Sequence, residues 1–317
     1  MRLWAILKKM CQITHGISKV SACESMNKIF LWFSLPVFAI FLIVSQAEPA
    51  KTRFSFINSI HEFSKEYPFL SPSALFVDGE ELYVADRAGR QICVFDLDGN
   101  PIFQFGKEKG LGQPFDFFVF EDRIHVSQIG KSSIEIFNIR GDRIGTVNPP
   151  FEGFIPGRMA MIDGGGFFVV DRVTLKICAF DKEGKYLYNF GGRNVFKSMM
   201  GITTKKDKVY VTVMDSYPVV RVFDLRGNYL TGFGRIGESK QLFSMPSGIK
   251  VDDQGIIWVA DLFKHKLSAF NEEGQYLAEY AGLTSLHYPL DFDFSGGLFF
   301  VLEKERKRIV VYKREYY

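Results

Sequence analysis

Short apolar stretches recur along the chain at a nearly constant spacing. Each repeat holds an apolar run that ends in Asp, as in LYVAD, FVVD and IWVAD, followed about ten residues later by an apolar run that ends in an aromatic residue. These aromatic residues lie 42 to 47 residues apart: Phe95, Phe137, Phe180, Phe223, Phe270 and Tyr312. A Gly stands four residues after each of the first five, where a hairpin needs a positive φ. Four short strands fit in each repeat and a helix does not, which is typical of a propeller blade.

Six repeats are present, and the sixth stops after its third strand, at Tyr312. The missing fourth strand is found near the other end of the chain, where SIHEFS (59–64) matches the fourth strands PIFQFG and YLTGFG. We therefore expect an all-β fold, a six-bladed β-propeller of four-stranded antiparallel blades formed by residues 48–317. The N-terminal strand should close the ring and so remove its exposed edge strands. Two packed sandwiches would not explain why half a repeat stands at each end.

The same residues carry a family resemblance. An opening Pro, an apolar strand, a Val-Ala-Asp phrase, a strand that ends in Phe-Asp and a closing strand that ends in Phe-Gly recur over residues 57–317. This order resembles the NHL repeat, here of an exported, bacterial type, which implies a six-bladed propeller but no single activity. Three repeats depart from the Ala-Asp phrase and so weaken any six-fold set of Asp residues: Ser127-Gln128, Thr212-Val213 and Leu302-Glu303.

The first strand of each blade lines the central channel of a propeller, and alternate residues of a strand face opposite sides. Counting from the opening Pro puts five charged residues on the channel side: Asp116, Arg158, Lys250, Asp291 and Asp293. We expect ion pairs across the channel wall, Asp116 with Arg158 and Lys250 with Asp293. The alternative is that Asp116, Asp291 and Asp293 hold a hard cation such as Ca²⁺, which prefers carboxylate oxygens. No other cofactor is predicted.

Three further residue types have structural explanations. Asp86, Asp171 and Asp261, at the ends of second strands, are expected to accept hydrogen bonds from the following turn. His125 fills a slot that Tyr or Trp fills in other repeats and should pack in the core, while His265 and His287 fall in loops and indicate no zinc site. Matching positions in separate repeats lie apart in space, so two Cys residues should be buried thiols and not a disulfide: Cys93 and Cys178.

The N-terminal segment has a different character. Residues 29–44 form an uncharged apolar run, preceded by Lys28 and followed by Ser45-Gln46-Ala47, which puts small residues at −3 and −1 of a cut after Ala47. This order is typical of a secretory signal, so we expect residues 1–47 to be an export signal that is cleaved, with Met26 as a candidate start. The run is shorter than the ~20 residues of a spanning helix, and an uncleaved signal anchor in the inner membrane is the alternative. The protein is therefore expected in the periplasm or outside the cell.

Charge separates the two faces of the expected ring. The formal charge is +3 for the whole chain, but without residues 1–47 it is −1, which disfavours a nucleic-acid binder. The loops between second and third strands hold eleven Lys/Arg and six Asp/Glu, and the loops between blades hold seven and four. A basic face attracts anionic partners. We expect binding through Lys264, Lys266, Lys304, Arg306, Lys307 and Arg308.

These features predict a monomeric, non-catalytic binding or scaffold module of the cell envelope, whose partner is a protein or an anionic glycan. The sequence contains no recognisable catalytic constellation. The alternative is a metal-dependent propeller enzyme of the lactonase, lyase or hydrolase type, with its site at the central channel; this rests on analogy of fold alone. RNA binding, which the resemblance to animal NHL proteins would allow, conflicts with the export signal.

Overall fold

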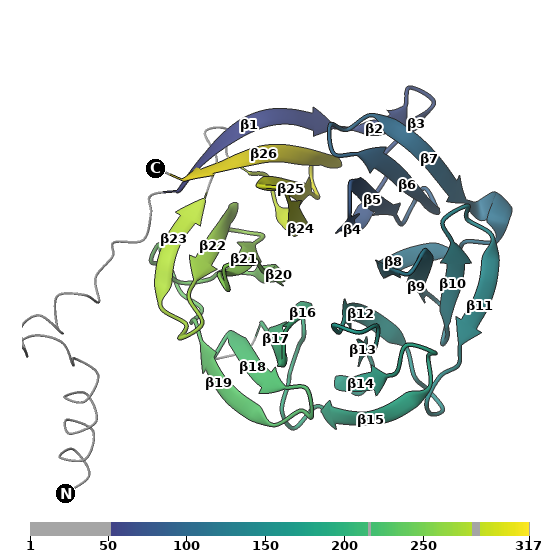
Figure 1. The fold of residues 1–317 in the computed structure, drawn as a ribbon. Coiled ribbons are helices and arrows are strands. Elements are labelled where there is room, and N and C mark those ends of the chain that lie inside the picture. The colour runs from purple at the N-terminus through teal and green to yellow at the C-terminus, as the bar shows by residue number, and fades with distance from the viewer. Residues whose placement is uncertain (1–51, 215–216, 281–285, 317) are drawn as a thin grey trace, which may run out of the picture. The chain divides into compact units, whose positions relative to one another are not determined.

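The computed structural model describes residues 52–214, 217–280 and 286–316, which form six four-stranded antiparallel sheets around a common axis (Figure 1). The prediction of an all-β, six-bladed propeller is confirmed. The first strand of each blade lies next to the axis, and the inner strands contact one another in a closed circle. Among the described residues the sole helical element is a 3-10 turn, Lys107–Lys109.

Blades one to five each use four consecutive strands, in order from the axis outward. Blade one contains β4 (Pro72–Asp78), β5 (Glu81–Asp86), β6 (Gln91–Asp96) and β7 (Pro101–Gly106). Blade two contains β8 (Gln113–Phe120), β9 (Arg123–Ile129), β10 (Ile134–Asn138) and β11 (Arg143–Val147). Blade three contains β12 (Pro156–Met161), β13 (Phe167–Asp171), β14 (Lys176–Phe180) and β15 (Tyr186–Gly191). Blade four contains β16 (Gly201–Lys205), β17 (Lys208–Thr212), β18 (Val220–Asp224) and β19 (Tyr229–Phe233). Blade five contains β20 (Pro246–Val251), β21 (Ile257–Asp261), β22 (Lys266–Phe270) and β23 (Tyr276–Tyr280).

Blade six is built from both ends of the propeller. It contains β24 (Pro289–Ser295), β25 (Leu298–Glu303), β26 (Arg308–Tyr316) and, as its fourth strand, β1 (Thr52–Ile60), which lies beside β26 in Figure 1. The predicted closure of the ring by the N-terminal strand is confirmed. A separate two-stranded hairpin, β2 (Glu62–Ser64) with β3 (Tyr67–Pro68), follows β1.

The predicted bounds of that closing strand, 59–64, are wrong by several residues. Ile60 pairs with Ile309, and so takes the place that the alignment gave to Phe63. The reason is that β26 is nine residues long and needs a long partner. Phe54 fixes the register, because its ring packs on those of Trp258, Tyr280 and Phe299 with centroids 5.7, 4.2 and 5.0 Å away. Such aromatic contacts outweigh the weaker match of Phe63 to the repeat.

The marker aromatics and the hairpin glycines lock each blade to its neighbour. All six aromatics are buried, at 3% exposure or less. Gly141, in the last hairpin of blade two, has a φ of 77° and touches Phe105 of blade one: a Cβ there would lie 2.4 Å from the Phe105 Cβ. Gly99 has a φ of 90° and meets Ile60 in the same way. The contact between Gly99 and Ile60 identifies β1 as the fourth strand of blade six.

The Asp residues that end second strands join two loops. Asp86 accepts a hydrogen bond from the Gly89 N–H in the following turn (3.2 Å), as predicted, and also from the N–H groups of Leu70 and Ser71 before the blade (both 2.7 Å). Asp171 and Asp261 do the same in blades three and five. Two of the repeats without this Asp keep the hydrogen bond to the preceding loop through longer side chains. Gln128 Oε1 accepts from the Gly112 N–H, and Glu303 Oε1 accepts from the His287 N–H.

Three other core predictions concern Cys and His. Cys93 and Cys178 are buried, free thiols, as expected. Burial raises the pKa of the Cys178 thiol to about 12, and that of Cys93 further still. His125 is buried and stacks on Phe118 with ring centroids 4.6 Å apart. Burial lowers the pKa of His125 to about 4, so it is a neutral packing residue, as predicted.

The predicted export segment, residues 1–47, lies outside the described residues. The chain divides into two units, residues 1–50 and 51–317, and the propeller is the second. Within the ranges that the structure describes, no helix has the length and apolar character needed to cross a membrane. Signal cleavage, anchoring and export therefore stay predictions.

Candidate functional site

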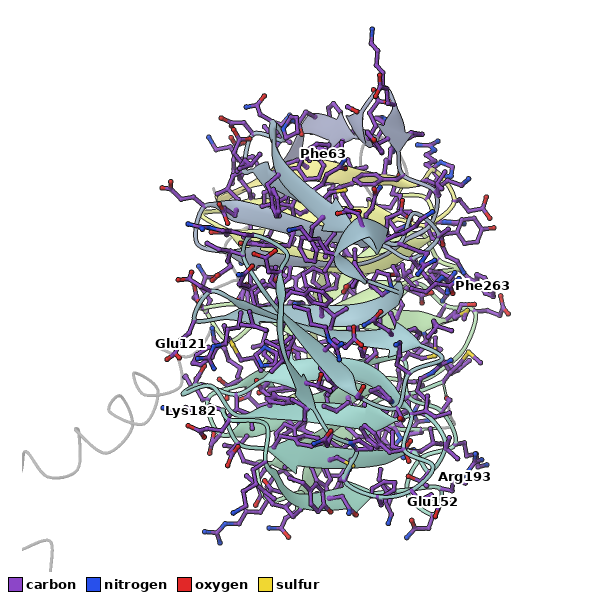
Figure 2. All side chains as sticks on the ribbon, turned by 90° about the vertical axis from the view of Figure 1, so that its right-hand side faces the viewer. Phe63, Glu121, Glu152, Lys182, Arg193 and Phe263 are labelled. Atoms are coloured by element: carbon purple, nitrogen blue, oxygen red, sulfur yellow. The ribbon has the colours of Figure 1, made fainter. Side chains whose placement is uncertain are left out.

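Loops emerge on two opposite faces of the ring. The upper face carries the loops between second and third strands and the loops between blades; the lower face carries the hairpins that join first to second and third to fourth strands. Figure 2 views the ring edge-on. The upper face, with Arg193 and Phe263, is at the right of the picture, and the lower face, with Glu121 and Lys182, is at the left. This matches the two loop sets that the repeat predicted.

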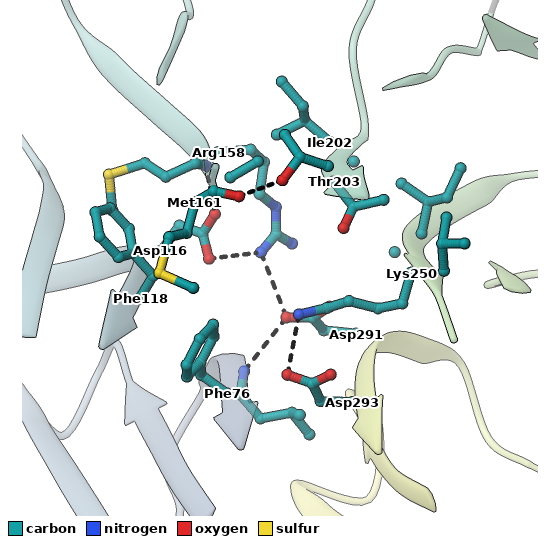
Figure 3. Close-up of a pocket in the computed structure, with 18 of the residues that line it drawn as sticks. Phe76, Asp116, Phe118, Arg158, Met161, Ile202, Thr203, Lys250, Asp291 and Asp293 are labelled. Atoms are coloured by element: carbon teal, nitrogen blue, oxygen red, sulfur yellow. Dashed lines mark hydrogen bonds and ion pairs between the residues drawn. The ribbon is translucent and has the colours of Figure 1, made fainter. Parts of the chain in front are cut away.

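Charged side chains of the inner strands meet across the middle of the channel (Figure 3). Arg158 Nη1 lies 3.4 Å from Asp116 Oδ1 and 3.8 Å from Asp291 Oδ2, and Lys250 Nζ lies 3.0 Å from Asp293 Oδ2. Both predicted ion pairs are confirmed. The contact between Arg158 and Asp291 was not predicted, because it spans the channel from blade three to blade six.

The same carboxylates also bind the backbone of the neighbouring blade. Asp116 accepts a hydrogen bond from the Met159 N–H (2.7 Å), Asp291 from the Leu75 N–H (3.3 Å) and Asp293 from the Val77 N–H (3.2 Å). The first of these bonds joins blade two to blade three, and the other two join blade six to blade one. These three Asp residues therefore stabilise the contacts between blades, those at the closure included.

The alternative prediction was a cation site formed by the three Asp carboxylates. Among the residues that the structure describes, no group of three or more His, Cys, Asp or Glu side chains is arranged to hold a metal ion. Arg158 and Lys250 occupy the positions next to these carboxylates that a cation would take. Their guanidinium and ammonium groups thus supply positive charge to these carboxylates, and the cation site stays a prediction.

Burial sets the protonation behaviour of this cluster. Desolvation raises the pKa of Asp291 to about 6, although Arg158 and Lys250 act in the opposite direction. The pKa of Asp116 is also raised, for the same reason. Burial alone would lower the pKa values of Arg158 and Lys250, but the neighbouring carboxylates outweigh it and raise both. Both cations therefore stay charged, and the pKa values that burial raises in this cluster are those of Asp116 and Asp291.

The charged cluster divides the channel into two chambers. The lower chamber has a volume of about 290 Å³ and is lined by Phe76, Phe118, Lys250 and the Asp residues of the cluster. The upper chamber has a volume of about 460 Å³ and opens on the upper face. Arg158 lines both chambers and forms the partition between them.

The upper chamber combines cations with apolar side chains. Arg87, Arg158, Arg172, Lys197 and Lys304 line it, and the described residues around it include no carboxylate. The apolar part of its wall consists of Phe115, Val170, Leu175, Met199, Met200 and Leu290.

Phe115 holds two of the cations in this chamber in place. Its ring centroid lies 4.7 Å from the Arg172 guanidinium and 5.5 Å from that of Arg158, which is the geometry of a cation–π contact. A third cation of the chamber, Arg87 of blade one, is held by a hydrogen bond in which its Nη2 donates to Ser71 Oγ (3.1 Å).

The six residues predicted to form the basic binding face fall into two groups. Lys266 is buried and pairs with Glu279 (2.7 Å), Arg308 pairs with Glu303 (2.6 Å), and Lys264 donates to four backbone carbonyls between Gly237 and Leu242. These three cations stabilise the fold and are not free to meet a partner. Lys304, Arg306 and Lys307 are exposed, but only Lys304 lines the upper chamber. The structure does not bring the six together as one patch.

A second basic region, which the sequence did not reveal, runs over blades three to five of the upper face. We call it the cationic arc. It alternates exposed apolar side chains with cations that touch the same loops: Val173, Arg193, Val195, Arg221, Tyr217, Arg235, Ile236 and Phe263. Its apolar members are 38 to 56% exposed.

Contacts between loops make the arc continuous. Arg193 Nε donates to the Val173 carbonyl (2.9 Å), and Arg221 donates to the carbonyls of Val195 and Pro218. The Arg235 guanidinium lies 4.6 Å from the centroid of the Tyr217 ring. Lys264 Nζ donates to the Gly237 carbonyl (2.8 Å) and so ties the loop of Ile236 to that of Phe263, without itself being free for a partner. The alternation therefore continues from loop to loop.

Comparison with known proteins shows the fold and no more. No family model matches the chain, and no curated protein matches it. The chain is similar to a structural genomics protein of unknown function from Bacteroides thetaiotaomicron VPI-5482, at 16% identity and a TM-score of 0.63, covering 84% of this chain and 77% of that one. It is also similar to virginiamycin B lyase from Staphylococcus aureus, at 12% identity and a TM-score of 0.59, covering 83% and 99%. A streptogramin B lyase is similar at 14% identity and a TM-score of 0.59, covering 85% of this chain and 89% of that one. The NHL family itself stays a prediction.

Sequence reasoning missed the chamber residues for an identifiable reason. Arg87 and Arg172 each directly follow the Asp that ends a second strand, and Phe115 directly follows the opening Pro of blade two. An alignment of the repeats can place all three beside the channel. Charge summed over whole loops, however, does not separate cations at the channel mouth from cations at the rim.

Proposed function

We propose that this protein is an exported, monomeric, non-catalytic binding module whose upper face docks an acidic, partly apolar segment of a protein in the cell envelope. The cationic arc supports this most directly. Its cations give complementarity to an anionic surface, and its apolar side chains are of the kind that protein interfaces cover.

A protein partner fits the arc better than an anionic glycan does. A glycan would engage Arg193 and Arg235 but would leave the aliphatic side chains of Val173, Val195 and Ile236 uncovered. The point of chain entry is compatible with this use of the face. Thr52 pairs with Tyr316, at the end of β26 distant from the upper loops, so β1 begins on the lower side of the ring and leaves the upper face open.

Two variants of the arc test this function. Arg193→Glu with Arg235→Glu reverses its charge, and Tyr217→Ser with Phe263→Ser removes its aromatic area. Each pair should weaken capture of a partner from envelope extract by about ten-fold or more. Capture by the wild type and by the aromatic pair should fall with added salt, whereas capture by the charge-reversed pair should depend on salt much less. Stability should change little, since exposed substitutions typically cost less than about 0.5 kcal/mol.

The lower face supplies the matched controls. Lys182→Glu with Lys185→Glu changes charge equally, and Leu187→Ser removes an apolar side chain of comparable exposure. These variants should capture as the wild type does. Equal losses on both faces would refute the proposal, and captured material that survives protease treatment would identify a glycan instead.

The alternative, a metal-dependent enzyme of the lactonase, lyase or hydrolase type, needs a bound metal at the channel. We expect purified protein to contain no stoichiometric Ca²⁺ or transition metal by elemental analysis. A stoichiometric metal that is lost in both Asp116→Asn and Asp291→Asn would overturn the non-catalytic proposal and restore the predicted cation site.

A further inference from the structure

We propose that the upper chamber is a second binding site, separate from the cationic arc, for a small organic anion that joins a carboxylate to an apolar body. Nothing in the proposed docking function requires such a site. Its support comes from the charge, the wall and the size of the chamber.

The charge of the chamber has one sign. Arg158 is neutralised by the carboxylates of Asp116 and Asp291. These two carboxylates line the lower chamber and not the upper one. Within the described residues, Arg158 contacts these carboxylates and the Ser73 carbonyl through Nη1 alone. The Nη2 group is therefore left to donate to a ligand. Guanidinium groups bind carboxylates with paired, charge-assisted hydrogen bonds.

The second cation of the chamber is also positioned by the fold. Gly157, in β12, lies under the Arg172 side chain, because a Cβ there would come within 2.7 Å of Arg172 Cγ. The absent side chain lets the aliphatic stem of Arg172 lie against the backbone. The guanidinium is then held over the Phe115 ring at 4.7 Å. Two guanidinium groups thus stand on the same aromatic ring, as a prepared anion site would require.

The opposite wall explains why a bare inorganic anion is not the best ligand. Leu175, Met199 and Met200 are only partly buried and line the chamber on the side of blades three and four. Covering such surface stabilises a complex because apolar area is removed from water, and Met side chains adapt to varied shapes. A ligand with an apolar body gains from this wall, and one without it does not.

The size of the chamber limits the ligand to a small molecule. Its volume of about 460 Å³ lies within the range of small-molecule pockets. Polymers and protein segments are too large to enter, although they can lie on the arc outside. The two sites therefore differ in ligand class as well as in residues.

Isothermal titration of the protein purified from the cell envelope tests this with three probes of related structure. These are 4-phenylbutyrate, butyrate, which lacks the ring, and 4-phenyl-1-butanol, which lacks the charge. We expect 4-phenylbutyrate to bind at least about ten-fold more tightly than either of the others. No binding of 4-phenylbutyrate at millimolar concentration, or equal binding of all three, would overturn the proposal.

A pair of variants locates the site. Arg172→Gln should weaken 4-phenylbutyrate binding by about ten-fold, and Arg306→Gln, an exposed cation of the same face outside the chamber, should not. Neither should alter folding, since both side chains are exposed. If both variants bind as the wild type does, the chamber is not the site. The docking function is tested separately by the arc variants, so either proposal can fail while the other stands.

Discussion

At the scale of single residues, the channel cluster illustrates how a propeller uses buried charge. Asp116, Asp291 and Asp293 each neutralise a cation and also accept a backbone N–H from the next blade. A buried ion pair often stabilises little, because desolvation offsets the attraction. Additional backbone hydrogen bonds are what make such a cluster favourable, and they explain why the acids rather than the cations define the contacts between blades.

Replacement of Asp291 by Asn should change the pH dependence of stability. The folded-state pKa of Asp291 is raised to about 6 from 3.8, so between these values the folded state binds more protons than the unfolded state. This group's contribution to the free energy of unfolding therefore rises as pH falls from 7 toward 4. Relative to Asp291→Asn, the wild type should gain on the order of 1–3 kcal/mol over that range. Urea denaturation at several pH values measures this, and parallel profiles would contradict it.

At the scale of elements, the hairpins between third and fourth strands join each blade to the one before it, and β1 completes the last blade. The hairpin glycines were predicted from φ alone, and the structure adds a second reason. Each touches the fourth strand of the preceding blade, as Gly141 touches Phe105 and Gly227 touches Phe190. A glycine at this point thus satisfies two conditions, a left-handed backbone and close approach of a neighbouring blade.

A matched pair of glycines separates these two conditions. Gly141 and Gly153 have nearly equal φ values of 77° and 78°, but only at Gly141 would an added Cβ meet a neighbouring atom within 4 Å. Gly153→Ala should cost about 1–2 kcal/mol for the left-handed backbone. Gly141→Ala should cost a further ~1–3 kcal/mol, because the methyl group would overlap Phe105. Chemical denaturation of both variants measures the difference, and equal losses would show that the blades can separate without cost.

At the scale of the whole molecule, the sequence predicted more of the fold than of the site. The period, the marker aromatics and the half repeat at each end identified six blades and their closure, because these features depend on local strand and turn chemistry. The register of β1 was missed, since it depends on Phe54 meeting Trp258 and Tyr280, far away in sequence. Likewise, Lys264 and Lys266 look like surface cations until their carbonyl and carboxylate partners are known.

Loss of β1 should destabilise the whole ring. A protein that begins at His61 would lack Phe54 and Ile60, two buried side chains whose removal typically costs about 2–5 kcal/mol each. It would also expose the edge of β26. This loss approaches the whole stability of a typical protein, ~5–15 kcal/mol. A protein that begins at Thr52 is the control and should unfold like the longer form. Thermal unfolding with light scattering compares them, and equal transitions would contradict the assigned closure.

The pairing of β1 with β26 also orders the events of biosynthesis. Ser55 and Glu315, which lie in these strands and are hydrogen-bonded, are separated by 260 positions in the chain. Because a ribosome delivers the chain from its N-terminus, β1 is made before blades one to five and its partner strand is made after them. Until then the nascent chain can form only five complete blades, with β1 unpaired at one end of an open array and the open edge of β25 at the other. Such edges invite association between chains. A chaperone that holds this intermediate should therefore be needed until β26 emerges, and translation arrest shortly before Arg308 should leave the longest-lived aggregation-prone species.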